Sequence, residues 1–201
     1  LRPCLAQDHL MTALGGNGGS LHARWPAARA LNLTVAIAGV HPDFPSYKRA
    51  SVDSALLEAV SEINTVGAAV RMRVLPAGSE ADIPIYLTGA ARGEAIADTG
   101  FSGLDGAVIQ AGMVTLWWNQ GEIRSSGIAL SRELRRRSIR SVLLEELVQS
   151  LGLATDLRNP TYASRSIFDE DSNAVTRLTG QDAQALRLHY PRLGFSSNAS
   201  E

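Results

Sequence analysis

The sequence predicts a single α+β domain built on a mixed, twisted sheet of about five strands. The first observation is the order of segments along the chain, which runs strand, helix, four strands, helix, loop and helix. The second is size and composition. The chain has 201 residues, of which 45% are hydrophobic and 19% are charged, as in an ordinary soluble globular protein with one core.

Residues 31–194 are predicted to form the domain, residues 1–30 a flexible N-terminal extension and residues 195–201 a short tail. The extension contains the run GGNGGS at positions 15–20, which has no side chains that could build a core. Trp25 lies near the end of the extension and is expected to anchor it to the domain.

Alternating apolar residues with many β-branched members predict the strands. The strands are expected at residues 31–40, 70–74, 81–88, 107–118 and 122–130. Adjacent side chains of a strand point to opposite faces, so Trp117 and Trp118 cannot both enter one core. One of them is expected to line a surface groove or to cover the far face of the sheet.

Apolar residues at helical spacing predict helices at residues 47–66 and 179–190, in addition to a helix around residues 139–151. Thr179 is a suitable N-cap residue for the last helix, and Asp182 stands three residues later, as in a variant of the capping box. We therefore expect these two side chains to cap the start of that helix.

The helix around residues 139–151 has one apolar and one polar side. The apolar stripe comprises Ile139, Leu143, Leu147 and Leu151. Glu145, Glu146 and Gln149 fall within about 100° of arc on the other side. Gly152 is expected to end the helix with a positive φ. Two interpretations are open, namely a surface helix whose acids face water and a helix that presents these acids in a site.

The composition also bears on partners. A formal net charge of −1 and a pI near 6.5 give no electrostatic reason to expect a nucleic acid or an anionic membrane. No apolar run reaches the roughly 18 residues of a membrane span. The single cysteine, Cys4, excludes an internal disulfide and a cysteine zinc cage. Its place near the start is compatible with the lipid anchor of a bacterial lipoprotein or with a free thiol.

Residues 145–156 resemble the zinc helix of the metzincin peptidases, whose motif reads HExxHxxGxxH or ends in Asp. In that family two histidines one turn apart hold zinc, the Glu polarises the attacking water, and the Gly turns the chain toward the third ligand. In this sequence the motif positions are held, in order, by Glu145, Glu146, Gln149, Gly152 and Thr155, with Asp156 one residue beyond.

Other segments resemble the matrixin-type metzincins in the same order along the chain. Ser166-Ile167-Phe168 is similar to the Met-turn, with Phe168 at the methionine position, and residues 178–190 are similar to the last helix. The resemblance spans about residues 31–193 and implies a metzincin-like fold in which Gly152, Ser166 and Phe168 are structural.

The stretch EELVQSLGLATD is more closely similar to an uncharacterised proteobacterial lipoprotein family, domain of unknown function 2927. This resemblance implies a periplasmic or envelope-associated protein, lipid-anchored if Cys4 is modified.

The chain departs from the metzincins at the zinc ligands. Zinc prefers imidazole and thiolate, whereas the four histidines lie away from the helix, at positions 9, 22, 41 and 189. We therefore expect no zinc cofactor. Glu145, Gln149 and Asp156 are candidate oxygen ligands of a harder ion, beside which Glu146 would be a general base. Alternatively, Glu145 and Gln149 hydrogen-bond each other across one helical turn and replace the metal structurally.

Three functions are compatible with these residues. The first is a zinc-less pseudopeptidase of the bacterial envelope that binds an unidentified peptide or protein. For it, the resemblance implies that an extended peptide pairs with the edge strand near residues 114–117, where Trp117 or Trp118 supplies an apolar contact. The second is a metallopeptidase-like hydrolase with Glu146 as base. The third is a structural module whose polar helix face is a sealed hydrogen-bond network.

Overall fold

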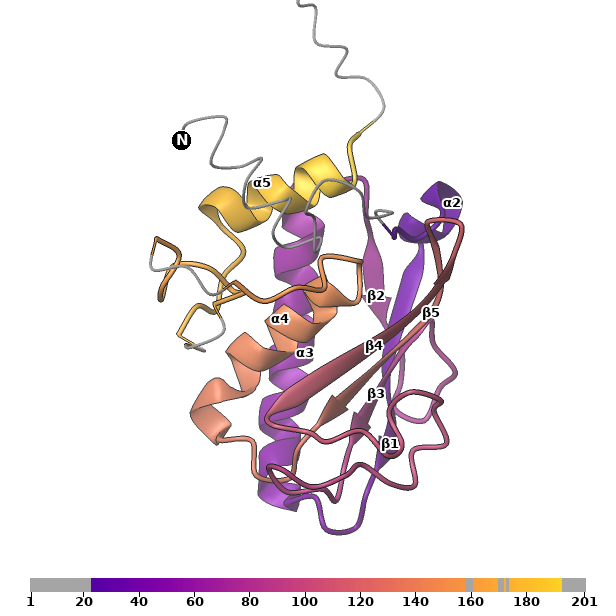
Figure 1. Cartoon of the computed structure of the whole chain (residues 1–201), viewed down its shortest axis with the longest axis vertical. Coiled ribbons are helices and arrows are strands. Elements are labelled where there is room, and N and C mark those ends of the chain that lie inside the picture. Colours follow the sequence, from indigo (N-terminus) through magenta and orange to yellow (C-terminus); the bar gives the residue numbers. More distant parts are fainter. Residues whose placement is uncertain (1–22, 158–160, 170–171, 173, 193–201) are drawn as a thin grey trace, which may run out of the picture.

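The computed structural model describes residues 23–157, 161–169, 172 and 174–192, and it has the predicted α+β architecture (Figure 1). The strands are β1 (Leu33–Val40), β2 (Met72–Val74), β3 (Ile83–Leu87), β4 (Gly112–Asn119) and β5 (Glu122–Leu130). The helices are α2 (Ala27–Ala30), α3 (Arg49–Thr65), α4 (Ile139–Gln149) and α5 (Gly180–His189), with short 3-10 turns η1 (Ser46–Lys48) and η2 (Arg136–Ser138). Cys4 lies outside the described residues.

The sheet has the strand order β2-β1-β3-β5-β4, and all neighbours are parallel except β4 and β5. The antiparallel pair is a hairpin turned at residues 120–121, so β4 occupies an edge of the sheet. Figure 1 shows this edge strand crossing in front of the sheet on the side where α4 lies. The fold therefore places an unpaired strand edge next to the helix that carries the acids.

The predicted strand at residues 107–118 is wrong in its first part, because β4 begins at Gly112. Residues 107–109 pair back onto the preceding loop instead: the Ile96 N–H donates to Ala107 O at 2.8 Å, and the Ile109 N–H donates to Glu94 O at 3.0 Å. These local bonds satisfy the backbone of an apolar segment before it can join the sheet.

The sheet has a core on each face. The larger core joins the sheet to α3, α4 and α5. The smaller one packs Ala129 of β5 against Ala90, Ile96, Leu104 and Ile109 from the glycine-rich segment that precedes β4. This segment has no regular periodicity, yet it covers the far face of the sheet.

Helix α4 is buried on almost every side. The predicted stripe is confirmed, since Ile139, Leu143, Leu147 and Leu151 are each at most 1% exposed. However, residues off the stripe are equally buried, namely Val142, Leu144 and Val148. A helix that is apolar nearly all round belongs in an interior, so the interpretation of α4 as a surface helix with acids in water is wrong. No helix within the described residues is long and apolar enough to cross a membrane.

Side chains from both ends of the described chain contact the backbone carbonyl groups at the C-terminal end of α4. Trp25 Nε1 donates to Ser150 O at 3.0 Å, and the Tyr190 hydroxyl donates to Leu151 O at 2.8 Å. The Tyr190 oxygen also accepts the Trp25 N–H at 2.9 Å, and His189 Nε2 lies 3.0 Å from Leu151 O. Carbonyl groups at a helix end have no partner within the helix, and here tertiary contacts supply them.

Residues 23–30 pack against the rest of the domain. Trp25 is 4% exposed and Ala30 is fully buried. Arg29, in α2, forms an ion pair with Asp82 at the entrance to β3. Trp25 thus anchors this segment as predicted, through a buried ring that bonds to Ser150 O and a backbone N–H that bonds to the Tyr190 oxygen. The packed domain begins before residue 31.

The segment predicted to resemble a Met-turn is fixed by an acid of α5. Asp182 accepts hydrogen bonds from Ser166 Oγ and from the Ile167 N–H, both at 2.8 Å. Ser166 Oγ also accepts the Phe168 N–H at 3.1 Å, and Phe168 is fully buried. The predicted capping box is wrong: Thr179 is the N-cap residue but makes no side-chain cap bond, and Asp182 is used by the turn.

We expect Asp182→Asn to lower the free energy of unfolding by about 2 to 4 kcal/mol. Each carboxylate oxygen of Asp182 accepts one of the two bonds, an amide keeps only one of these acceptor atoms, and Asp182 is 2% exposed. Urea denaturation followed by circular dichroism measures the change. Asp53→Asn is the control: Asp53 forms an exposed i,i+4 ion pair with Arg49, and its loss should cost less than about 0.5 kcal/mol. Equal effects of the two substitutions would show that Asp182 does not hold the turn.

Candidate functional site

Glu146 is a carboxyl group enclosed between α4 and the beginning of β4. Its side chain is 7% exposed. Gly112 lies directly against it, and a Cβ atom at that position would collide with the Glu146 carboxylate and come within 2.6 Å of Val142 Cγ1. Only glycine therefore lets the edge strand approach the helix this closely. No hydrogen bond or ion pair joins the Glu146 carboxylate to any residue in the described part of the chain.

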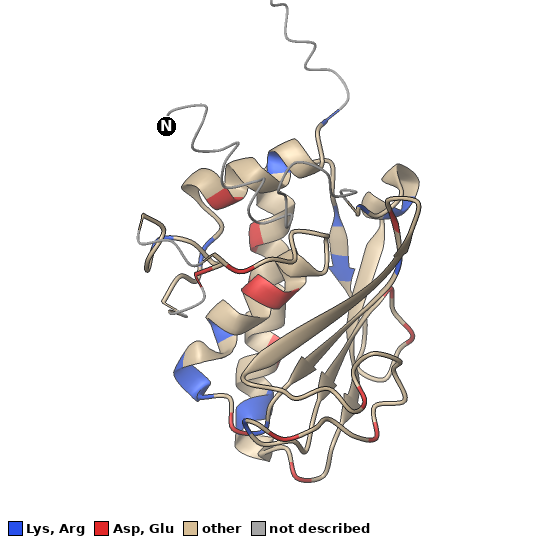
Figure 2. Cartoon of the chain, in the orientation of Figure 1, with Lys and Arg blue, Asp and Glu red and all other residues tan. Residues whose placement is uncertain are grey.

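Burial raises the pKa of Glu146 to about 8, and the nearby Asp156 carboxylate adds to the shift. Burial also raises the pKa of Glu145 to about 9, reinforced by the carboxylates of Glu146, Asp156 and Asp169. Loss of hydration and repulsion from like charges both disfavour the ionised acid, and no cation of the described chain offsets them. The site is therefore a cluster of acidic side chains. Figure 2 shows red acidic residues on α4, separated from the blue basic residues at the start of the helix.

The residues predicted as oxygen ligands lie near one another, but their oxygen atoms do not converge on a common point at which an ion could bind. Gln149 Nε2 donates to Asp156 Oδ1 at 2.6 Å. The predicted Glu145–Gln149 hydrogen bond is therefore not formed, because the Gln149 amide is directed to the loop after α4. That loop is stabilised further by Asp169, which accepts the Ser164 N–H at 2.6 Å.

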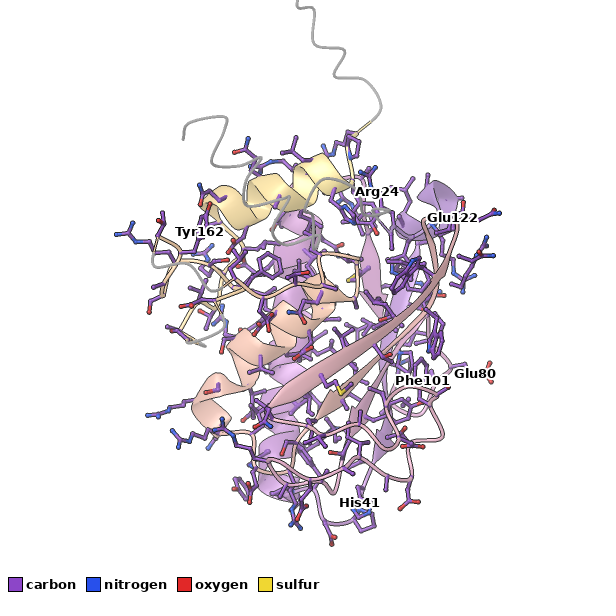
Figure 3. The ribbon with its side chains drawn as sticks, viewed as in Figure 1. Arg24, His41, Glu80, Phe101, Glu122 and Tyr162 are labelled. Atoms are coloured by element: carbon purple, nitrogen blue, oxygen red, sulfur yellow. The ribbon has the colours of Figure 1, made fainter. Side chains whose placement is uncertain are left out.

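Zinc does not fit this set of residues. The amide nitrogen of Gln149, at the position of the second metzincin histidine, is a hydrogen-bond donor and cannot bind a metal. His189 bonds at the C-terminal end of α4, and His41 lies at the opposite end of the molecule from α5 (Figure 3). His9 and His22 lie outside the described residues. Within those residues, no three His, Cys, Asp or Glu side chains converge closely enough to hold a metal ion.

The predicted structural residues lie at the end of α4 and in the loop that follows it. Gly152 has φ of +104°, as expected of the residue that ends a helix, and a Cβ there would collide with the Ala23 carbonyl. Ser166 and Phe168 form the turn held by Asp182. Tyr162, 6% exposed, belongs to the same loop region and lies between α4 and α5 in Figure 3. Sequence reasoning missed Gly112 and the contact of Asp169, and it assigned Asp182 to a helix cap instead of to this turn. No local pattern identifies these contacts.

The edge of β4 next to Glu146 presents unpaired backbone groups. The Ser131 N–H donates to Ala111 O, which fixes the alternation along the strand. Met113, Thr115 and Trp117 therefore direct their backbone groups to β5, whereas Gly112, Val114 and Leu116 direct theirs away from the sheet. For these three residues the structure records no backbone partner among the residues it describes outside the sheet.

Trp117 and Trp118 are both exposed, at 51% and 55%, so neither enters a core. Trp117 Nε1 donates to Ser102 O at 3.2 Å, in the segment that covers the far face. Trp118 pairs with the core residue Ile123 after a register shift in the hairpin, which directs its side chain to the face on which α4 packs. Of the two predicted peptide-binding residues, the structure places Trp118 on the side of Glu146.

We expect Glu146→Gln to stabilise the protein at pH 8 by about 1 to 3 kcal/mol and to change its stability little at pH 4.5. Glu146 ionises near pH 4.5 in the unfolded chain and near pH 8 in the folded one. The contribution of Glu146 to the free energy of unfolding is thus fully present below pH 4.5, and it is lost as the pH rises through about 8. Urea denaturation at both pH values, with the exposed Glu80→Gln as control, measures this. A difference that does not vary with pH would refute the shift.

No curated protein matches the sequence. Residues 23–194, which include α2 and all five strands as well as the acidic region, match the family described as Protein of unknown function (DUF2927). The match covers most of the chain, and the protein belongs to this family.

Proposed function

We propose that the protein is a zinc-less, metzincin-like domain of the bacterial envelope that binds an extended peptide segment of another protein along the outer edge of β4. The observation that carries the proposal is the alternating row of outward backbone groups at Gly112, Val114 and Leu116, which has no partner among the described residues. An exposed strand edge is a template for a further strand, whose backbone supplies most of the affinity.

The surroundings of β4 favour a bound peptide over a free edge. Val114 and Leu116 are half-buried against the main core, so an added strand would extend an existing apolar surface. Trp118 adds a large exposed ring at the end of that strand, on the same face of the sheet. Aromatic rings of this kind are common anchors at interfaces.

The metzincin-like part of the proposal is supported by the arrangement of the elements. An outer antiparallel strand lies beside the helix that carries the degenerate motif, and a buried turn with Phe168 follows. The Gln149–Asp156 hydrogen bond occupies two of the candidate ligand positions. These features favour a metzincin-like arrangement of strand and helix that lacks the zinc ligands. The envelope location rests on the resemblance stated above and on Cys4.

Peptides selected from a phage-displayed library of random nonapeptides test the proposed pairing by hydrogen exchange read by NMR. A bound peptide should slow amide exchange of Gly112, Val114 and Leu116 at least about tenfold and leave Met113 and Thr115, which already bond to β5, unchanged. Protection of the first three amides in the free protein would show that the edge is already covered, by a second copy or by another part of the chain. Failure to select any peptide would overturn the proposal.

Val114→Pro and Val114→Ala form a matched pair for the same binding assay. Proline removes the outward N–H of Val114, which bonds nothing within the sheet, so the fold should tolerate it at an edge. We expect peptide affinity to fall at least about tenfold with proline and less than about threefold with alanine. Trp118→Ala should weaken binding, whereas Trp117→Ala should not. Equal affinities throughout the series would place the peptide elsewhere.

A second candidate function is hydrolysis, with Glu146 accepting a proton from water. An ion held by oxygens of Glu145, Gln149 and Asp156 would require the Gln149–Asp156 hydrogen bond to open first. The observation that favours hydrolysis is the pKa of Glu146, about 8, which suits proton transfer near neutral pH. A peptide-library cleavage screen with added calcium, manganese or zinc tests this function. Glu146→Gln should abolish the activity while Glu80→Gln, at an exposed acid away from α4 in Figure 3, retains it. Cleavage that survives Glu146→Gln would remove Glu146 from the reaction.

A further inference from the structure

We infer that the bound peptide carries a cationic side chain, Arg or Lys, at the residue that pairs with Gly112, and that this side chain binds the Glu146 carboxylate. The inference rests on the proposed function, because it takes the peptide as a strand added to β4. It names the chemical class of the partner, which strand pairing alone leaves open.

The first argument is that Glu146 has no partner of its own. It is 93% buried, and no Lys or Arg of the described chain forms an ion pair with it or with the half-buried Glu145. A buried carboxyl group without hydrogen bonds is costly, so proteins rarely keep one that serves only packing. A cation from a ligand would supply the missing charge and the missing donors together.

The second argument is the direction in which an added strand would point its side chains. Directly opposed residues of neighbouring strands place their side chains on the same face of the sheet. The missing Cβ of Gly112 points at the Glu146 carboxylate and at Val142 Cγ1. The peptide residue opposite Gly112 would therefore point toward α4, on the side where the Glu146 carboxylate lies against the Gly112 backbone.

The third argument is the charge around Glu146. Asp156 is close enough to disfavour the ionised form of Glu146, and the carboxylates of Glu146, Asp156 and Asp169 disfavour the ionised form of Glu145. Such an environment attracts a cation more strongly than a single carboxylate does. Because no three of the acids converge as metal ligands within the described residues, a guanidinium or ammonium group on a flexible stem fits better than a metal ion.

A positional scan of a selected nonapeptide tests the inference. Each position is replaced in turn by Arg and by citrulline, its neutral isostere, and by Lys and norleucine, and affinity is measured by fluorescence anisotropy at 0.15 M salt. At one position we expect the cationic member of a pair to bind at least about tenfold more tightly than the neutral one. Comparison of the Arg–citrulline pair with the Lys–norleucine pair shows whether the site prefers a guanidinium or an ammonium group.

The protein variants in this scan are Glu146→Gln and Glu80→Gln, which change the net charge equally. Glu146→Gln should reduce the cationic preference to less than about twofold, whereas Glu80→Gln should leave it intact. If peptides bind but no position prefers a cation, or if the preference survives Glu146→Gln, the inference is overturned and the proposed function stands. If no peptide binds the native protein, the proposed function itself fails.

Discussion

The two carbonyl groups that follow α4 fix the geometry on which the candidate site depends. A buried helix end is costly unless its last carbonyls find donors, and here Trp25, Tyr190 and His189 lie against the carbonyls of Ser150 and Leu151. These contacts come from opposite ends of the described chain. They hold α4 in one orientation inside the domain, and that orientation brings Glu146 against Gly112 at the edge of the sheet.

Much of the fold could be predicted because it depends on local patterns. The repeat of Leu143, Leu147 and Leu151 and the glycine after them located α4 and its end. The partner of Asp182 could not be predicted in this way. A carboxylate three residues into a helix can accept N–H groups of its own first turn or of any turn that the chain brings beside it. Only the path of the chain decides between these donors, and it favoured Ser166 and Ile167.

The sequence predicted which residues lie together in the candidate site, but it did not predict the contacts that they make. Helical spacing placed Glu145, Glu146 and Gln149 together, and the structure keeps them together with Asp156. The depth of their burial was not predictable from α4 alone, because it comes from the strand and loop packed over the helix. The proximity of Gly112 likewise follows from how β4 lies against α4, a tertiary relation that leaves no periodic signal in the sequence.

The contacts of Trp25 and Tyr190 with the end of α4 also affect the order in which the domain assembles. During synthesis the chain emerges from its N-terminus, so Trp25 and α4 are available long before Tyr190. Until the last helix is complete, the carbonyls after α4 lack their donors and the hydrophobic surface of α4 lacks part of its cover. We therefore expect the domain to complete its folding only after α5 has been synthesised, and fragments that stop before residue 189 should remain accessible to proteases and chaperones.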